Sequence, residues 1–195
     1  MADWLDTPIV KDAMYHATVV VSELSGNQYQ RRVRERLSPS DLDGETEHVH
    51  VESPLEATFI VWWTALDWFR RPLKFILRPQ QEITCGDKRY RADFVIDVYE
   101  AAARQAASIG HPWIPIVVEL DGHEFHEKTK EQIIYRNQRD RALQQHGSRV
   151  FHISYEEMQR AGLDSVIEIY SAAEDQLTQI VIALDKLGLK LQSRD

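Results

Sequence analysis

The sequence predicts an α/β fold in which helices flank a central sheet. The clearest sign of a sheet is residues 114–120, an apolar run of β-branched residues that is typical of a buried strand. Helix signals cover residues 53–69, 127–145 and 165–188, where apolar residues recur with helical spacing or helix-forming residues predominate. A chain of 195 residues is long enough to bury a core of this kind in one domain.

The composition is that of an ordinary soluble globular protein, with 43% hydrophobic and 28% charged residues. No apolar run is long enough to span a bilayer and the acidic N-terminus does not resemble a signal peptide, so we expect no membrane partner and a cytoplasmic location. The single cysteine, Cys85, rules out an internal disulfide framework and fits a reducing compartment. A formal net charge of -8 argues against a protein that coats nucleic acid non-specifically, but it leaves room for a locally basic groove.

Residues 1–50 are expected to form an N-terminal extension that packs on the core domain, residues 51–195. Residues 17–24 are rich in β-branched residues, and a Ser-Gly-Asn turn signal follows them. Residues 28–37 are therefore expected to return as the second strand of a β-hairpin. This returning strand is basic, which a solvated face or a contact with phosphate would explain.

A helix is predicted to begin after Ser53, which is a favourable N-cap. Pro54 suits the first helical turn, and Glu56 completes a capping box. Glu56 thus has a full structural explanation, and a second role as a carboxylate aimed at a functional site requires independent support. The apolar stripe of this helix consists of Leu55, Phe59, Trp62, Leu66 and Phe69.

Two strands joined by a tight turn are predicted next. The first strand is expected at residues 73–77, between Pro72 and Pro79, with residues 80–84 as its extension past Pro79. Residues 89–99 are expected to return after a turn of Cys-Gly-Asp-Lys composition. Asp93 and Asp97 share one face of the returning strand. An aspartate among apolar neighbours is either paired or chemically active, and Asp93 lies further from the solvated strand end.

The strand at 114–120 ends in acidic residues and histidines. Glu119 and Asp121 project from one face, because side chains alternate along a strand, and His123 and His126 follow them. Burying unpaired carboxylates is costly, and a metal ion is one common remedy. A strand end that reaches water, where the acids are solvated, would explain the same pattern.

The predicted helix at 127–145 is basic, with five lysines or arginines against three acids. Its position after the acidic strand end suggests a contact with phosphate, and a solvated face with ion pairs one turn apart is the other interpretation. A short strand is expected at 149–153. The amphipathic helix at 165–188 is expected to cover one face of the sheet, with packing against a second copy in a homodimer as an alternative.

Asp93 and Glu119 are candidates to chelate one divalent ion, since adjacent strands lie about 4.8 Å apart. Oxygen ligands with open coordination positions favour Mg²⁺ or Mn²⁺ over Zn²⁺. Such an ion binds a phosphate oxygen and lowers the pKa of a bound water. A histidine at the strand tip, or a lysine of the next helix, would then act as general base or hold the phosphate.

The order of these segments resembles the PD-(D/E)XK, or restriction-endonuclease-like, nuclease superfamily. The nearest likeness is to small uncharacterised domains related to the very-short-patch repair endonucleases, and it covers about residues 52–157. The resemblance implies a mixed sheet of four or five strands flanked by helices, and Mg²⁺-dependent phosphodiester hydrolysis with nucleic acid, chiefly DNA, as the substrate. It rests on Glu52–Glu56, Tyr90–Ile96, Val118–Gly122 with His123 and His126, Arg139–Leu143, Gly147 and Val150–Phe151.

The resemblance also implies roles for individual residues. Asp93 and Glu119 would be metal ligands with Asp121 as a third candidate, and Glu56 would be an acid that reaches the site from its helix. The lysine usual two positions after the second acid is replaced here by Asp121. The candidates to replace that lysine are His123, His126, Lys128, Lys130 and Gln132.

Two other functions remain open at this point. The missing lysine and the negative net charge favour a module that keeps the nuclease fold and only binds nucleic acid or protein. A Zn²⁺ site built from His123 and His126, with Cys85, is the other alternative, although two closely spaced histidines are a weak signal.

Overall fold

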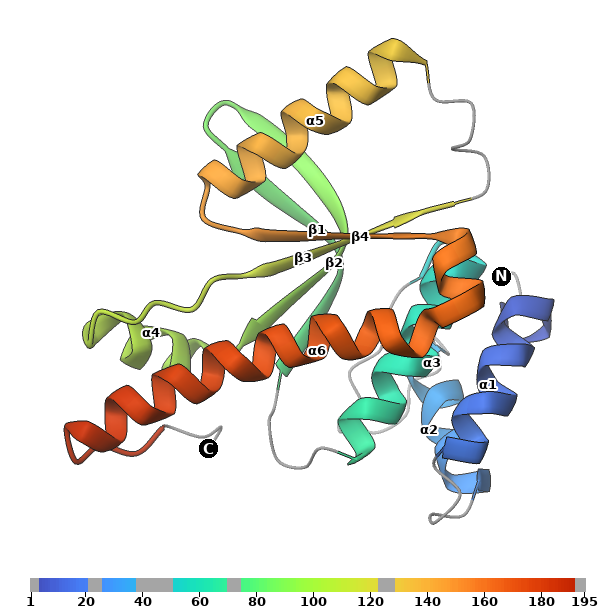
Figure 1. The fold of residues 1–195 in the computed structure, drawn as a ribbon, viewed down its shortest axis with the longest axis horizontal. Helices are drawn as coiled ribbons and strands as arrows, with labels where there is room; N and C mark the ends of the chain where they lie inside the picture. The colour runs from blue at the N-terminus through green and yellow to red at the C-terminus, as the bar shows by residue number, and fades with distance from the viewer. Residues whose placement is uncertain (1–3, 21–25, 38–50, 70–74, 123–128, 192–195) are drawn as a thin grey trace. The chain divides into compact units, whose positions relative to one another are not determined.

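The chain is mixed α/β, as Figure 1 shows for the computed structural model. Over the part of the chain that the structure describes there are six α-helices, and four strands form one mixed sheet. No helix in this part is long and apolar enough to cross a membrane. The described residues are 4–20, 26–37, 51–69, 75–122 and 129–191.

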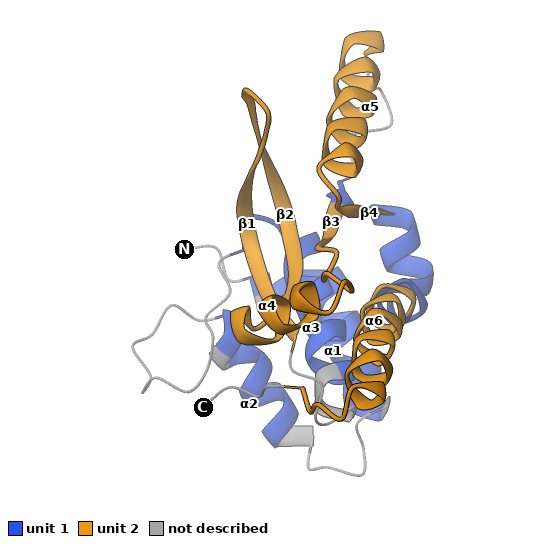
Figure 2. Ribbon diagram, turned by 90° about the vertical axis from the view of Figure 1, so that its left-hand side faces the viewer, with its two compact units in different colours: residues 1–71, 120–125, 153–167 blue, residues 72–119, 126–152, 168–195 orange. Residues whose placement is uncertain are grey.

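The chain divides into two compact units (Figure 2), and each is described by itself. Unit 1 comprises residues 1–71, 120–125 and 153–167. Unit 2 comprises residues 72–119, 126–152 and 168–195.

Unit 1 is built mainly from helices. A 3-10 turn at Trp4–Asp6 precedes α1 (Pro8–Val20), and α2 (Gly26–Leu37), α3 (Pro54–Phe69) and the first turns of α6 (Tyr155–Lys186) complete it. Helix α3 is buried on nearly all sides over residues 55–66, which agrees with its almost continuous apolar sequence. The predicted helix after Ser53 is therefore confirmed.

The β-hairpin predicted for residues 17–24 and 28–37 is wrong. Residues 17–20 end helix α1, and residues 28–37 lie within helix α2, while residues 21–25 lie outside the described residues. The buried positions of α2, Tyr29 and Val33, are four residues apart, which is the period of a helix and not of a strand. Burial of this one face therefore outweighs the strand propensity of the β-branched residues.

Tyr29 anchors α2 to α3 within unit 1. Its hydroxyl donates a hydrogen bond to the backbone carbonyl of Val61 over 2.6 Å, and the side chain is fully buried. Burial holds the pKa of Tyr29 well above the ordinary value, an effect that the positive charge of Arg36 only partly opposes.

Unit 2 contains most of the sheet. Strands β1 (Phe75–Cys85) and β2 (Lys88–Val98) form an antiparallel hairpin, and β2 also pairs antiparallel with β3 (Ile116–Asp121). Strand β4 (Arg149–Ser154) is the other neighbour of β3, and the backbone N–H of Arg149 donates to the carbonyl of Pro115 over 3.0 Å. The four predicted strands are confirmed, in the order β1-β2-β3-β4.

Helices pack on both faces of this sheet within unit 2. Phe75 stacks on Trp113, with ring centroids 5.9 Å apart, and meets Tyr170 of α6 edge to face at 5.3 Å. The prediction that the C-terminal helix covers one face is therefore confirmed for this part of α6. Helix α4 (Glu100–Ser108) links β2 to β3, and α5 (Lys130–Gln145) links β3 to β4.

Candidate functional site

Glu119 lies in strand β3 and is 5% exposed. Nη1 of Arg139, a residue of α5, lies 3.1 Å from Oε2 of Glu119, and the two side chains are only 17% and 7% exposed. A buried carboxylate requires such a partner, because desolvation of an isolated charge is very unfavourable. The two side chains therefore form a buried ion pair between helix and strand.

The pair continues into a chain of charged groups that joins β3, α5 and β4. Nε of Arg139 lies 3.7 Å from Oδ1 of Asp140, and Oδ2 of Asp140 lies 3.0 Å from Nε2 of His152. Arg136 approaches the same Oδ2 to 4.0 Å. We call these five residues, Glu119, Arg136, Arg139, Asp140 and His152, the α5 ion-pair cluster.

The spacing along α5 explains why the helix supplies this cluster. Arg136, Arg139 and Leu143 are three and four residues apart, so they share the face of α5 that meets the sheet. Leu143 is fully buried with Val95 and Val117. The face is thus apolar near the end of α5 and charged in its middle, which is why its apolar stripe is thin in the sequence.

Asp93 lies on β2, the strand next to β3. Phe94 pairs with Val118 and Val95 with Val117, so Asp93 and Glu119 each stand one residue beyond the last pair of this ladder. The prediction that Asp93 and Glu119 lie on neighbouring strands is confirmed.

The hairpin is irregular at Asp93. Ala92 and Val95 belong to one buried cluster although they are three residues apart, and a regular strand would direct them to opposite faces. The residue opposite Asp93 is Gln80, since Pro79 pairs with Phe94 and Gln81 with Ala92. Gln80 is the one non-glycine residue with positive φ, 49°, among the described residues. The regular alternation of side chains between the two faces of the sheet is therefore broken at Asp93 and Gln80.

Glu56 acts as a helix cap in unit 1. Its Oε1 accepts a hydrogen bond of 2.8 Å from the Ser53 hydroxyl, and its Oε2 accepts one of 3.0 Å from the backbone N–H of Glu52. The backbone N–H of Glu56 donates in return to the Ser53 hydroxyl. The Ser53 half of the predicted capping box is therefore present, while the Glu56 carboxylate accepts the N–H of Glu52 in place of the Ser53 N–H that a standard capping box uses.

The remaining predicted site residues fall in three places. Asp121 is the last residue of β3 and belongs to unit 1, and Lys130 is exposed at the start of α5. Gln132 caps α5: its Oε1 accepts from the backbone N–H of Thr129 over 2.9 Å, which gives this amide a structural use. His123, His126 and Lys128 lie outside the described residues.

Within the described ranges, no group of three or more His, Cys, Asp or Glu side chains is placed to hold a metal ion. Mg²⁺ is usually bound by one or two carboxylates, with water and substrate phosphate completing its shell. Asp93 and Glu119, on the neighbouring strands β2 and β3, supply two carboxylates for such a donor set. The cysteine of the alternative Zn²⁺ site, Cys85, lies partly buried at the end of β1.

The sequence interpretation did not identify His152 or the pairing of Arg139 with Glu119. Arg139 and Asp140 occur in the motif that carries the family resemblance. Arg139 stands four residues before Leu143, and this spacing could have indicated that Arg139 lies on the face of α5 that meets the sheet. His152 stands in a short strand, and nothing in the sequence marks it as a partner of Asp140, twelve residues earlier.

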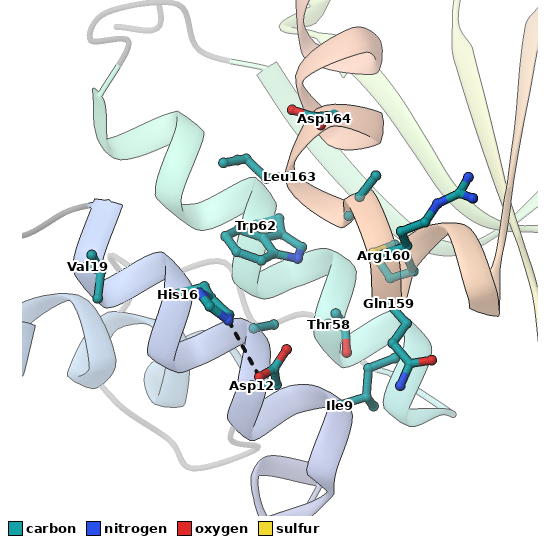
Figure 3. A pocket seen from close by; sticks show the side chains of 14 residues that line it. Ile9, Asp12, His16, Val19, Thr58, Trp62, Gln159, Arg160, Leu163 and Asp164 are labelled. Carbon is teal, nitrogen blue, oxygen red and sulfur yellow. Dashed lines mark ion pairs between the residues drawn. The ribbon is translucent and has the colours of Figure 1, made fainter.

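Unit 1 contains a separate cavity of about 380 Å³ (Figure 3). Helix α1 contributes the ion pair of Asp12 and His16, with 3.6 Å between Oδ1 and Nε2, and α3 contributes Trp62. Nε1 of Trp62 is buried and donates to no acceptor among the described residues. None of the residues predicted for catalysis lines this cavity.

No protein-family model matches this chain, and no match was found among curated proteins or among solved structures. The resemblance to the nuclease superfamily therefore rests on the sequence motifs alone.

Proposed function

We propose that this protein is a metal-dependent nuclease that hydrolyses phosphodiester bonds, with DNA as its substrate. The observation that supports this most is the pairing of β2 with β3, whose last pair, Phe94 and Val118, is followed by Asp93 on one strand and Glu119 on the other. Two carboxylates on neighbouring strands are suited to share one hard divalent ion, Mg²⁺ or Mn²⁺. Asp121, two residues beyond Glu119, is the candidate for a third oxygen ligand.

The bound ion would supply Lewis-acid stabilisation of the scissile phosphate and a water of lowered pKa. Glu119 and Asp93 would hold and orient that ion. Arg139 restrains the Glu119 carboxylate through the 3.1 Å contact and balances its charge in a buried setting. The ion pair thereby keeps a ligand in place that would otherwise be expensive to bury.

The general base is not a lysine two positions after Glu119, since Asp121 stands there. The proposal assigns proton transfer to His123 or His126, which follow the strand end directly, or to the exposed Lys130. Gln132 is a weaker candidate because its side chain already caps α5.

Local charge supports a polyanionic substrate. Between residues 129 and 149 the exposed cations are Lys130, Arg141 and Arg149, against one exposed acid, Glu131, in a protein whose formal net charge is -8. A locally positive surface on an acidic protein concentrates phosphate near it without general adhesion to nucleic acid.

Cleavage of plasmid and oligonucleotide DNA with Mg²⁺ or Mn²⁺ tests the proposal. We expect Glu119→Gln and Asp93→Asn each to lower the rate by at least about 100-fold, as loss of a group that stabilises transition-state charge does. Glu131→Gln is the matched control, since Glu131 is an exposed acid in the first turn of α5. Full cleavage by purified Glu119→Gln would contradict the proposal.

A binding module without turnover is the second candidate. The ion pair between Glu119 and Arg139 favours it, because it gives Glu119 a structural role that needs no metal. This function predicts nucleic-acid affinity with no cleavage under any divalent metal, and an unchanged affinity in Asp93→Asn.

A further inference from the structure

Two carboxylates share the guanidinium of Arg139. Its Nη1 lies 3.1 Å from Oε2 of Glu119, and its Nε lies 3.7 Å from Oδ1 of Asp140. The longer distance exceeds that of a hydrogen bond, so Asp140 attracts the guanidinium without holding it. Asp140 follows Arg139 directly in α5 and is only 20% exposed, so its negative charge competes with that of Glu119 for the same cation.

His152 occupies the other oxygen of Asp140. Its Nε2 lies 3.0 Å from Oδ2 of Asp140, and the two side chains are 21% and 20% exposed. An ionised carboxylate only accepts hydrogen bonds, so Nε2 is the ring nitrogen that carries the proton and donates it. Arg136 approaches the same oxygen only to 4.0 Å and is 31% exposed, so its attraction for Asp140 is the weaker one.

Apolar packing contributes little to the placement of these side chains. Leu143 is the one buried residue of α5, every residue of which the structure describes, so polar contacts largely decide how the middle of this helix meets the sheet. His152 belongs to β4, which is hydrogen-bonded to β3, the strand of Glu119. The contacts that link Glu119 to His152 therefore begin and end on neighbouring strands, with Arg139 and Asp140 between them.

We propose that His152 is a positioning residue for Glu119. By donating to Asp140, His152 holds that carboxylate, which leaves the guanidinium of Arg139 to Glu119. Without His152, Asp140 would draw the guanidinium toward itself, and Glu119 would lose the contact that orients its carboxylate. The inference rests on the proposed function, because Glu119 is a metal ligand there, and it adds a residue of β4 that the sequence motifs do not mark.

Calorimetric titration of the full chain with Mn²⁺ tests this role. We expect His152→Leu to weaken Mn²⁺ binding by about 10- to 100-fold, the usual effect of removing a group that orients a metal ligand from outside. His152→Gln should stay within about threefold of the unmodified protein, because the glutamine amide also donates to a carboxylate. His146→Leu is the matched control, since His146 is exposed at the end of α5. Equal affinities of His152→Leu and this control would overturn the proposal, as would a His152→Gln that binds as weakly as His152→Leu.

A second substitution separates positioning from a purely structural effect. Asp140→Asn removes the charge that competes for Arg139, so its combination with His152→Leu should restore Mn²⁺ affinity to within about threefold of the unmodified protein. Urea unfolding in EDTA shows which variants are folded during the titrations. Where His152→Leu alone does not fold, the folded double variant decides: affinity near that of the unmodified protein supports the proposal, and a loss of about tenfold or more overturns it.

The same titrations distinguish this role from the proposed function. Absence of Mn²⁺ binding from the unmodified chain would overturn the proposed metal site, and the role of His152 with it. Tight Mn²⁺ binding by the unmodified chain, combined with unchanged affinity but lower stability in His152→Leu, would overturn the role of His152 alone. That result would assign the contact between His152 and Asp140 to the stability of α5 only.

Discussion

Nη1 of Arg139 lies 3.1 Å from Oε2 of Glu119, and this contact ties the middle of α5 to strand β3. Both side chains are largely buried, so the pair is a structural element of unit 2 as well as part of the candidate site. The same carboxylate is the one that the sequence motif marks as a metal ligand. Stability and function should therefore both respond to changes at this pair.

Removal of the guanidinium should destabilise the fold strongly. We expect Arg139→Met to lower the free energy of unfolding by about 3 kcal/mol, because the Glu119 carboxylate stays buried without its guanidinium. The double variant Arg139→Met, Glu119→Gln should regain part of this loss, since an amide costs less to bury. Urea unfolding measures both, and exposed Arg141→Met is the control. Equal stabilities of Arg139→Met and Arg141→Met would show that the pair contributes little.

Glu56 should behave as a helix cap. We expect Glu56→Ala to lower the free energy of unfolding by about 1–2 kcal/mol, because the Ser53 hydroxyl and the Glu52 N–H lose their acceptor. Glu56→Gln should lose less than about 0.5 kcal/mol, since glutamine also serves in a capping box. Thermal unfolding measures the difference, with exposed Glu168→Gln as the control. A stable Glu56→Ala that has lost cleavage would instead assign Glu56 to the site.

Gly162 should tolerate no side chain. A Cβ at this position would lie 2.8 Å from Nε1 of Trp62 and 2.9 Å from Sδ of Met158, beside the bend of α6 at Ala161. We expect Gly162→Ala to cost about 1–3 kcal/mol, the usual penalty for overpacking. Adding Trp62→Phe should relieve part of the clash, because phenylalanine lacks the indole nitrogen. Denaturant unfolding of the single and double variants checks this, and a neutral Gly162→Ala would contradict the packing.

The raised pKa of Tyr29 predicts a loss of stability in alkali. The unfolded phenol titrates near pH 10.0, while the buried Tyr29 stays protonated well above that pH. Between the pKa of the unfolded tyrosine and that of the folded one, the unfolded chain binds fewer protons than the folded chain. The free energy of unfolding therefore falls as the pH rises, by up to about 1.4 kcal/mol per pH unit. Tyr29→Phe should show a shallower fall above pH 10 than the unmodified chain. Identical slopes in the two proteins would contradict the assignment.

The sequence is informative where local composition decides the structure. The run of β-branched residues ending at Glu119 and the cap formed by Ser53 and Glu56 could be predicted, because propensity and capping act over a few residues. A helix from Pro8 to His16 could also be expected, and it forms most of α1. The end of α1 and helix α2 could not, since Val19 and its neighbours favour a strand locally, whereas the buried positions Tyr29 and Val33 fit only a helix.

Two features of the candidate site also depend on distant parts of the chain. The contact of Arg139 with Glu119 requires a particular rotation of α5 over the sheet, which neither segment specifies alone. The irregularity at Asp93 accompanies a positive φ at Gln80, and glutamine is not a residue that signals such a conformation.

The central claim is that Asp93 and Glu119 together hold one divalent ion. Calorimetric titration of the full chain with Mn²⁺ tests this most directly, with Asp93→Asn, Glu119→Gln and the control Glu131→Gln beside it. One Mn²⁺ per chain in the unmodified protein and in the control, with at least about tenfold weaker binding in both site variants, is the predicted result. Mn²⁺ binding that is equally tight in all four proteins, or absent from all of them, would contradict the claim.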